Sequence, residues 1–281
     1  MKVLYIAKHG SGGNDDEGAI AHALRVLGHE VQLLQEENAD AVGHIRADFC
    51  LMHNLQTLGA LHKLNCPKAF WYFDLVEWPD PTLQRRCAAR VAWMNRIIPL
   101  VDVGFCTDGD WAKKRGLVCL RQGADERIVG MVDRSRSREI LFTGISKGGG
   151  VERERFVELM QNKFGPEFMH VRSGCYREKL RELIAKTAVY ICPPSPVTNH
   201  YWSNRVYNAL GFGANVLHPW CSELSGLADV ISFYHSQQDM LEMCKKMQDM
   251  DLYREEAVQA VKARHLYRHR VAELLRIACG A

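Results

Sequence analysis

One segment in the second half of the chain combines residue types that bind phosphate groups. It is YWSNRVYNALGFGANVLHP, residues 201–219, in which Ser203, Asn204 and Arg205 stand directly before an apolar helical pattern. Hydroxyl, amide and guanidinium groups all donate hydrogen bonds, and a guanidinium can bind two phosphate oxygens at once. The same residues would also serve as a helix cap and a surface charge. The segment therefore predicts either an anion site or a capped surface helix.

A second candidate for phosphate binding is the glycine-rich segment FTGISKGGGVERERF, residues 142–156. Glycines expose backbone N–H groups, the following helix contributes the positive end of its dipole, and a lysine adds charge. Gly144, Lys147 and Gly148 are the candidate residues here. A glycine-rich turn without a ligand fits the same residues equally well.

Three side chains are candidates for a general base, which removes the proton from a hydroxyl group. Asp74 follows the apolar segment KAFWYF, His53 follows ADFCLM, and Asp16 lies in the acidic start of the first helical pattern. A carboxylate or imidazole within reach of the hydroxyl can accept its proton. Asp15, Glu17 and Glu77 are further rivals. We favour Asp74 as the base.

Two patterns that suggest metal sites have simpler explanations. Asp108 and Asp110 form a DxD pattern, but CTDGDWAKKRG is typical of a strand end followed by a capped helix. His265 and His269 have the i, i+4 spacing of zinc ligands, without a third ligand or an HExxH pattern. The ten cysteines are widely spaced, which favours reduced core residues over disulfides or zinc sites. We expect no metal site and no required cofactor.

Apolar segments of strand length alternate with helical patterns along the whole chain. They include KVLYIA, HEVQLL, ADFCLMH, KAFWYF and VDVGFCT, then ILFTGIS, EFMHVR, AVYICPP, NVLHP and VISFY after the charged connector DRSRSRE. This alternation is typical of parallel sheets covered by helices on both faces. The pattern predicts an α/β protein of two doubly wound, Rossmann-like domains, residues 1–134 and 135–281. Such sheets bind ligands at the carboxyl ends of their strands, so we expect the functional loops in a cleft between the domains.

The C-terminal part of the chain is predicted to be helical from Gln237 onward. Its methionines recur at helical spacing, which is typical of core filling. These last helices are candidates for packing back onto the first domain.

The composition describes an ordinary globular chain. It has 281 residues, 47% of them apolar and 25% charged, with a net charge of +3. No apolar run is long enough to span a membrane, and the start, MKVLYIAKHG, is typical of a buried strand rather than of a signal peptide. These features predict a cytoplasmic protein.

The segment SNRVYNALGFGANVLHP and the tail that follows it resemble the C-terminal domain of GT-B glycosyltransferases. The resemblance is to the group typified by spore-maturation-type proteins. Their pattern is serine, asparagine and arginine, followed by an apolar helix with a glutamate, a small residue and a glycine. His265, His269 and Arg270 match the end of that domain. The two-domain layout extends the resemblance loosely to the whole chain.

The resemblance implies a nucleotide-diphosphate sugar, such as a UDP-sugar, bound mainly by the second domain, with the acceptor on the first. Ser203, Asn204 and Arg205 would contact the diphosphate or sugar, and Tyr201 lies beside them. Two positions depart from the family, because its glutamates fall at His200 and Asn208. Asn208 can still form a hydrogen bond with a ribose hydroxyl, but without charge.

The sequence therefore predicts a glycosyltransferase that moves a sugar from a nucleotide sugar to an acceptor hydroxyl. A nucleotide-binding protein without transfer activity is an alternative, because the two glutamates are missing. An NAD-dependent oxidoreductase fits the alternation of strands and helices, but Asp15 interrupts the GxGxxG pattern in HGSGGNDDEG.

The acceptor itself is open, and a hydroxymethylated base in DNA is one candidate. Basic clusters could follow a phosphate backbone, and tryptophans could stack on an extruded base. The near balance of charges in residues 1–134 argues against this acceptor. The residues concerned are Arg85, Arg86, Arg90, Lys113, Lys114 and Arg115, with Trp78, Trp93 and Trp111.

Overall fold

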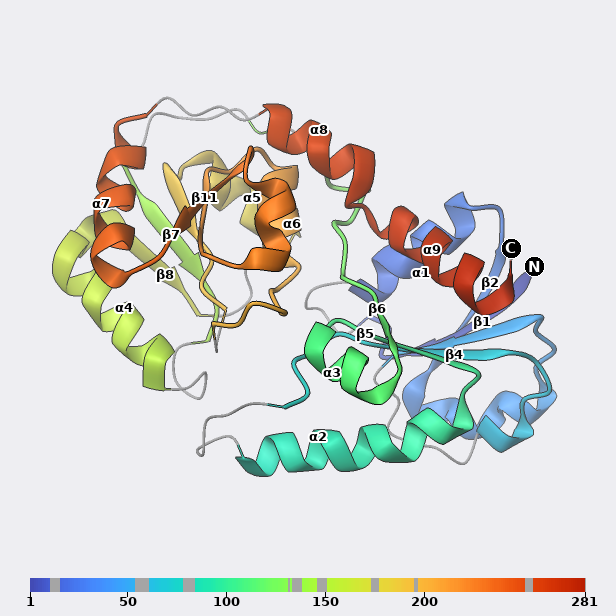
Figure 1. The fold of residues 1–281 in the computed structure, drawn as a ribbon. Coiled ribbons are helices and arrows are strands. Elements are labelled where there is room, and N and C mark those ends of the chain that lie inside the picture. Colours follow the sequence, from blue (N-terminus) through green and yellow to red (C-terminus); the bar gives the residue numbers. More distant parts are fainter. Residues whose placement is uncertain are drawn as a thin grey trace. The chain divides into compact units, whose positions relative to one another are not determined.

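A computed structural model describes most of the chain as two compact units. The described residues are 1–10, 16–53, 61–77, 84–130, 132, 138–145, 151–172, 177–194, 197–250 and 255–280. Unit 1 comprises Met1–Gly123 together with Leu266–Ala281, and unit 2 comprises Ala124–His265. Each unit is a parallel sheet flanked by helices (Figure 1), as the alternating sequence pattern predicts. Within the described ranges, no helix is both long and apolar enough to cross a membrane.

Unit 1 is built on a six-stranded parallel sheet with the strand order β2-β1-β3-β4-β5-β6. Its strands are β1 (Lys2–Ala7), β2 (Glu30–Gln35), β3 (Phe49–Met52), β4 (Lys68–Tyr72), β5 (Val103–Cys106) and β6 (Val118–Cys119). Its helices are α1 (Asp16–Val26), α2 (Gln84–Ile97), α3 (Gly109–Arg115) and α9 (Tyr267–Cys279).

The helices of unit 1 cover both faces of this sheet. Because successive strand residues point to opposite faces, Val3 and Tyr5 pack in one core with α1 and α9. Leu4 and Ile6 pack in the other core with residues of α2 and α3. Figure 1 shows α1 and α9 together on one side of the strands and α2 on the other. The central strands are therefore buried on both sides, which explains their nearly continuous apolar sequences.

Unit 2 is built on a five-stranded parallel sheet with the strand order β11-β10-β9-β7-β8. Its strands are β7 (Ile140–Thr143), β8 (Phe168–Val171), β9 (Val189–Ile191), β10 (Val216–Pro219) and β11 (Ile231–Tyr234). Its helices are α4 (Val151–Phe164), α5 (Arg177–Ala185), α6 (Arg205–Gly211), α7 (Gln237–Gln248) and α8 (Glu255–Arg264). Residues of α4 and α7 share one apolar core on one face of the sheet, and that core includes Met240 and Met247. Both methionines fill the core, as their spacing predicts.

The units differ from the division expected at residues 134 and 135. The chain leaves unit 1 at Gly123 and returns at Leu266, so that α9 belongs to the core of unit 1. Residues that precede the charged connector already pack in unit 2, since the Gly130 N–H donates to the carbonyl of Gly211 at 3.0 Å. The Ala124 N–H donates to the carbonyl of His265 at 2.7 Å, which ties the two crossing segments together.

Helix α3 shows how local sequence sets these boundaries. The Asp108 carboxylate caps its first turn by accepting from the Trp111 N–H at 3.1 Å, and it also accepts from the Val76 N–H at 3.1 Å. The helix ends at Gly116, whose φ of +67° suits glycine. Asp108 is 2% exposed, so both of its bonds are shielded from water. The capping role predicted for this aspartate is confirmed.

Asp108→Ala should lower the free energy of unfolding by about 1–3 kcal/mol, because two buried N–H groups lose their acceptor. Urea unfolding of the full chain measures this loss. Asp110→Ala, at an exposed position in the same turn, is the matched control and should cost about 0.5 kcal/mol or less. Equal losses in the two variants would contradict the capping role.

Candidate substrate sites

The order of the strands places a candidate site in each sheet. In unit 2, β8 lies on one side of β7 and β9 lies on the other. At such a switch point the loops that follow the two central strands diverge, which leaves room for a ligand at the carboxyl edge. Unit 1 has the same reversal between β1 and β3. Polar residues that follow β7 and β9, or β1 and β3, are therefore the first candidates.

Arg205, the first residue of α6, reaches the carboxyl end of β7. Its Nη1 donates to the carbonyl of Thr143, and its Nε donates to Ser203 Oγ at 3.1 Å. Gly144 allows this approach, because a Cβ at that position would lie 2.6 Å from Nη1 of Arg205. Its φ of +147° is also rarely adopted by residues with a side chain. Glycine is needed at position 144 for both reasons.

Arg153, in the first turn of α4, bridges the segments that follow the two switch strands. Its guanidinium donates to the carbonyls of Ile145 and Pro193, each at 3.4 Å. Its Cζ lies 5.8 Å from the centre of the Phe142 ring. Its Nε is buried and has no hydrogen-bond partner among the residues that the structure describes. Burial, and to a lesser extent the charge of Arg205, lowers the pKa of Arg153 to about 10.

These two guanidinium groups form a candidate anion site. Within the described part of the chain, neither makes an ion pair with a carboxylate. Burial raises the pKa of the nearby Cys192 thiol, so the thiol is neutral and supplies no negative charge. Two like charges in a partly buried place repel, and a buried donor without a partner costs about 1–3 kcal/mol. A ligand with several anionic oxygens would relieve both costs, and a diphosphate has this chemistry.

The glycine-rich segment contributes space to this site. The Gly144 N–H already donates to the carbonyl of Val171 at 2.9 Å, and its carbonyl oxygen lies 2.8 Å from His170 Nε2. Gly144 therefore makes room for Arg205 and does not offer its own N–H to a ligand. Lys147 and Gly148, the other candidates of this segment, lie outside the described residues.

The remaining donor-side candidates lie just before and within α6. The Ser203 hydroxyl accepts a hydrogen bond from Nε of Arg205. Asn204 is buried, and its side chain does not cap the helix. Asn208 follows one turn after Arg205, and its Oδ1 is buried without a hydrogen-bond partner in the described part of the chain. A hydroxyl group of a ligand could satisfy that oxygen. His200 and Tyr201, in the segment before α6, are half-buried.

The switch point of unit 1 holds a buried histidine. His53 directly follows β3 and is 3% exposed. Its Nδ1 lies 2.9 Å from the carbonyl of Trp71, and because a carbonyl only accepts, Nδ1 carries the proton. Its Nε2 lies 3.5 Å from Oε1 of Glu17, in the first turn of α1. The lone pair of Nε2 therefore faces a carboxylate that follows the neighbouring strand β1.

Both members of this pair have a lone pair that can accept a proton. Burial lowers the pKa of His53 to about 4, against the opposing effect of its bond to Trp71, and the charge of His9 lowers it further. A neutral imidazole nitrogen and a carboxylate both accept, so no hydrogen bond joins His53 to Glu17 in this state. A hydroxyl group that approaches the pair from one side could donate to either one.

The other candidates for the base have different surroundings. Asp74 is exposed, and its Oδ2 accepts from Nη2 of Arg90 at 3.1 Å. It follows β4, which is not one of the two switch strands. Asp16 is the first residue of α1 and is half-buried beside Glu17. The structure brings Glu17 and His53 together and keeps Asp74 in an exposed ion pair.

The described residues contain no group of three or more His, Cys, Asp or Glu side chains arranged to hold a metal ion. The two C-terminal histidines have structural contacts instead. His265 stacks on the Tyr207 ring with the centroids 5.1 Å apart, and His269 Nδ1 accepts from the Leu266 N–H at 3.2 Å.

Comparison with known proteins agrees with this architecture. Residues 147–276 match the model of a family described as glycosyl transferase-like. An alpha-glucosyltransferase, solved in complex with UDP and a 13-mer DNA containing a central A:G mismatch, is similar over 99% of both chains, with 12% identity and a TM-score of 0.65. The chain has the GT-B glycosyltransferase fold. The GT-B fold expected from the resemblance is thus confirmed.

Two other solved structures are similar to this chain in fold. The OtsA apo structure matches over 99% of both chains, with 8% identity and a TM-score of 0.64. An alpha1,3-fucosyltransferase with GDP-fucose matches over 97% of this chain and 88% of its own, with 9% identity and a TM-score of 0.54. No curated protein matches the chain at a significant level of sequence similarity.

Sequence reasoning did not find Arg153. It lies in the quoted segment VERERF, but the four alternating charges there are also typical of a solvated helix face. The available clue was its position in the first turn of a helix that follows a glycine-rich loop. The charge of Arg205 close to it depends on tertiary structure and could not be recognised from either segment alone.

Arg153→Gln and Arg205→Gln should each weaken the binding of inorganic pyrophosphate by at least about tenfold, because each removes one of two charge-assisted contacts. Calorimetric titration of the full chain measures the affinity. Lys163→Gln, an exposed change in the last turn of α4, is the control and should leave it unchanged.

A thermal measurement distinguishes this role from a structural one. Without an anion, Arg153→Gln should change the melting temperature little, because the loss of the two long hydrogen bonds to Ile145 and Pro193 is offset by the removal of a repelling charge. Pyrophosphate should raise the melting temperature of the wild type more than that of the variant. Equal shifts in both proteins would contradict the anion site.

Proposed function

We propose that this GT-B protein transfers a sugar from a nucleoside-diphosphate sugar to an acceptor hydroxyl. The observation that carries the proposal is the pair Arg153 and Arg205 at the switch point of unit 2, without a carboxylate partner among the described residues. The match of residues 147–276 to the glycosyl transferase-like family supports it, because that segment includes both arginines.

In this proposal the arginine pair stabilises the leaving group. The bond between the anomeric carbon and the diphosphate oxygen breaks, and negative charge grows on the departing nucleoside diphosphate. Arg153 and Arg205 are already fixed by bonds to backbone carbonyls, so they need little reorganisation as the charge develops. Asn208, with its buried Oδ1, would accept a hydrogen bond from a ribose hydroxyl.

Unit 1 would supply the base. The acceptor hydroxyl gives its proton to Nε2 of His53 as its oxygen forms the bond to the anomeric carbon. The Trp71 carbonyl holds Nδ1–H of His53, so the lone pair of Nε2 is available. Glu17, 3.5 Å from Nε2, would stabilise the imidazolium that forms. This placement favours His53 over Asp74, whose carboxylate is paired with Arg90.

A hydroxymethylated base in DNA is the second candidate acceptor, and one of the similar structures holds DNA. The described part of unit 1 gives this acceptor little support. Trp111 is 3% exposed, and Trp93 packs on Phe70 with the ring centroids 5.3 Å apart. Trp111 lies in the core and is not available for stacking on a base, and the half-buried Trp93 already packs against Phe70 and Tyr72. Trp78 lies outside the described residues.

The basic clusters are also partly neutralised. Arg90 pairs with Asp74 and Lys114 pairs with Glu77, at 3.1 Å each. These ion pairs favour a small molecule over DNA as the acceptor. The side chains of Arg85 and Arg86 are not described.

His53→Gln should lower kcat for sugar transfer by about 10²–10⁴-fold, the usual contribution of a general base, while the affinity for the nucleoside diphosphate stays unchanged. Asp74→Asn should change kcat by no more than about twofold. Mass spectrometry of UDP-sugars and GDP-sugars with candidate acceptors measures turnover. Loss of turnover in Asp74→Asn with normal turnover in His53→Gln would restore Asp74 as the base.

The pH dependence gives a further outcome of the same assay. Because the base must be unprotonated and burial lowers the pKa of His53 to about 4, kcat/KM should stay level from about pH 8 to about pH 5.5. A fall centred near the ordinary histidine pKa of about 6.5 would contradict a buried, neutral base. Nucleotide binding with no turnover under any condition would support the alternative of a protein without transfer activity.

A further inference from the structure

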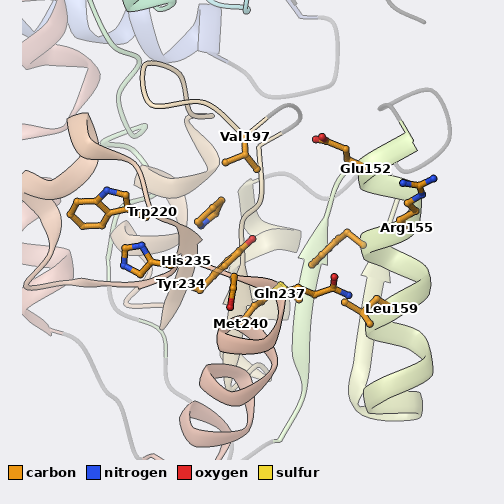
Figure 2. Close-up of a pocket in the computed structure, with 12 residues that line it drawn as sticks. Glu152, Arg155, Leu159, Val197, Trp220, Tyr234, His235, Gln237 and Met240 are labelled. Atoms are coloured by element: carbon orange, nitrogen blue, oxygen red, sulfur yellow. The ribbon is translucent and has the colours of Figure 1, made fainter. Parts of the chain in front are cut away.

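Unit 2 contains a cavity whose lining includes neither Arg153 nor Arg205. It has a volume of about 620 Å³, which is within the usual range for a small-molecule site. It lies between α4 and α7 where β10 and β11 end (Figure 2). Its lining residues are Glu152, Arg155, Phe156, Leu159, Val197, Pro219, Trp220, Tyr234, His235, Ser236, Gln237 and Met240.

One wall of the cavity presents a fixed aromatic surface. The Trp220 ring stacks on the His235 ring with the centroids 5.4 Å apart, and it meets Phe233 edge-on at 5.3 Å. These neighbours hold the indole in place, yet Trp220 is 41% exposed. Val197, 52% exposed, lines the same cavity. Two of the large apolar side chains exposed in the described residues therefore line the same cavity, as expected of a binding site.

The opposite wall carries polar groups without partners. Figure 2 shows Glu152 and Arg155 of α4 on the side away from Trp220 and His235. Neither charged group forms an ion pair or a hydrogen bond within the described ranges, and the same holds for the side chain of Gln237. Gln237 and Tyr234 belong to α7 and β11 rather than to this wall, and the Tyr234 hydroxyl also makes no hydrogen bond within the described part of the chain. The wall thus offers donors and acceptors together.

The positive and negative charges on this wall are equal in number. The anion site, in contrast, has two positive charges and no negative one among the described residues. One carboxylate, Glu152, accompanies one guanidinium, Arg155. Arg153 lies between them in sequence, but it donates to the carbonyls of Ile145 and Pro193. An anionic ligand in the cavity would meet the Glu152 carboxylate, and an aliphatic ligand would leave the polar groups unsatisfied.

We propose that this cavity binds a neutral saccharide ring. A pyranose has an apolar face of C–H groups, which suits the negative face of the Trp220 indole. Its neighbouring hydroxyls both donate and accept, so a pair of them can bond to the Glu152 carboxylate or to the Arg155 guanidinium. The proposal does not depend on the proposed function, because it requires no nucleotide and uses neither Arg153 nor Arg205.

Saturation-transfer difference NMR of the full chain without nucleotide tests the proposal. The probes are maltotriose and the methyl glycosides of glucose, galactose, mannose and N-acetylglucosamine, with uridine as the comparison. At least one saccharide should bind and uridine should not. Trp220→Ala and Glu152→Ala should each weaken that binding by at least about tenfold, whereas Lys163→Gln on α4 should leave it unchanged.

Trp220→Ala should also keep the wild-type affinity for pyrophosphate, which shows that the variant is folded and separates the cavity from the anion site. Glu152→Ala changes an exposed position on α4 and serves as the second variant if Trp220→Ala does not fold. The proposal is overturned if no saccharide binds, if saccharide binding survives both substitutions, or if uridine occupies the cavity through Trp220. Loss of pyrophosphate binding in the wild type would contradict the proposed function and leave the saccharide result standing.

Discussion

The repulsion between Arg153 and Arg205 is the interaction on which this account of the protein depends. Each guanidinium is anchored to backbone carbonyls at the carboxyl edge of one sheet, and the described residues provide no carboxylate between them. Burial, with the charge of Arg205, lowers the pKa of Arg153 without making it neutral at physiological pH. The fold therefore maintains an unfavourable pair of charges that a multiply charged anion would convert into a favourable one.

The order of the strands explains why Arg153 and Arg205 lie near each other at the carboxyl edge of the sheet in unit 2. In both sheets the first strand has its neighbours on opposite sides, so the loops diverge at the carboxyl edge. In unit 2 this edge holds the arginines, and in unit 1 it holds His53 facing Glu17. The same topology thus presents cationic groups in one unit and proton-accepting groups in the other. Leaving-group stabilisation and proton removal are the two tasks that sugar transfer requires.

Much of the fold could be predicted from the sequence, because buried parallel strands have continuous apolar sequences and the helices between them are amphipathic. The cap at Asp108 was also predictable, since it depends on residues three positions apart. The site was predictable only in part. Arg205 was found from its own segment, but Arg153 gains its role from long-range contacts with Pro193 and from the charge of Arg205.

The unit boundary and the base illustrate the same limit. A charged connector marked the expected boundary, whereas contacts between distant segments assign residues 124–132 to unit 2. Asp74 was favoured as the base from its place after a strand, and only the structure pairs it with Arg90. Strand order cannot be obtained from apolar runs alone, and it determines which of several strand ends become neighbours.

A crystal structure of the full chain with bound UDP or GDP tests the central claim most directly. The account predicts diphosphate oxygens within hydrogen-bonding distance of the guanidinium groups of both Arg153 and Arg205, at the switch point between β7 and β9. A nucleotide whose diphosphate lies elsewhere in the protein, with neither guanidinium in contact with it, would contradict the account.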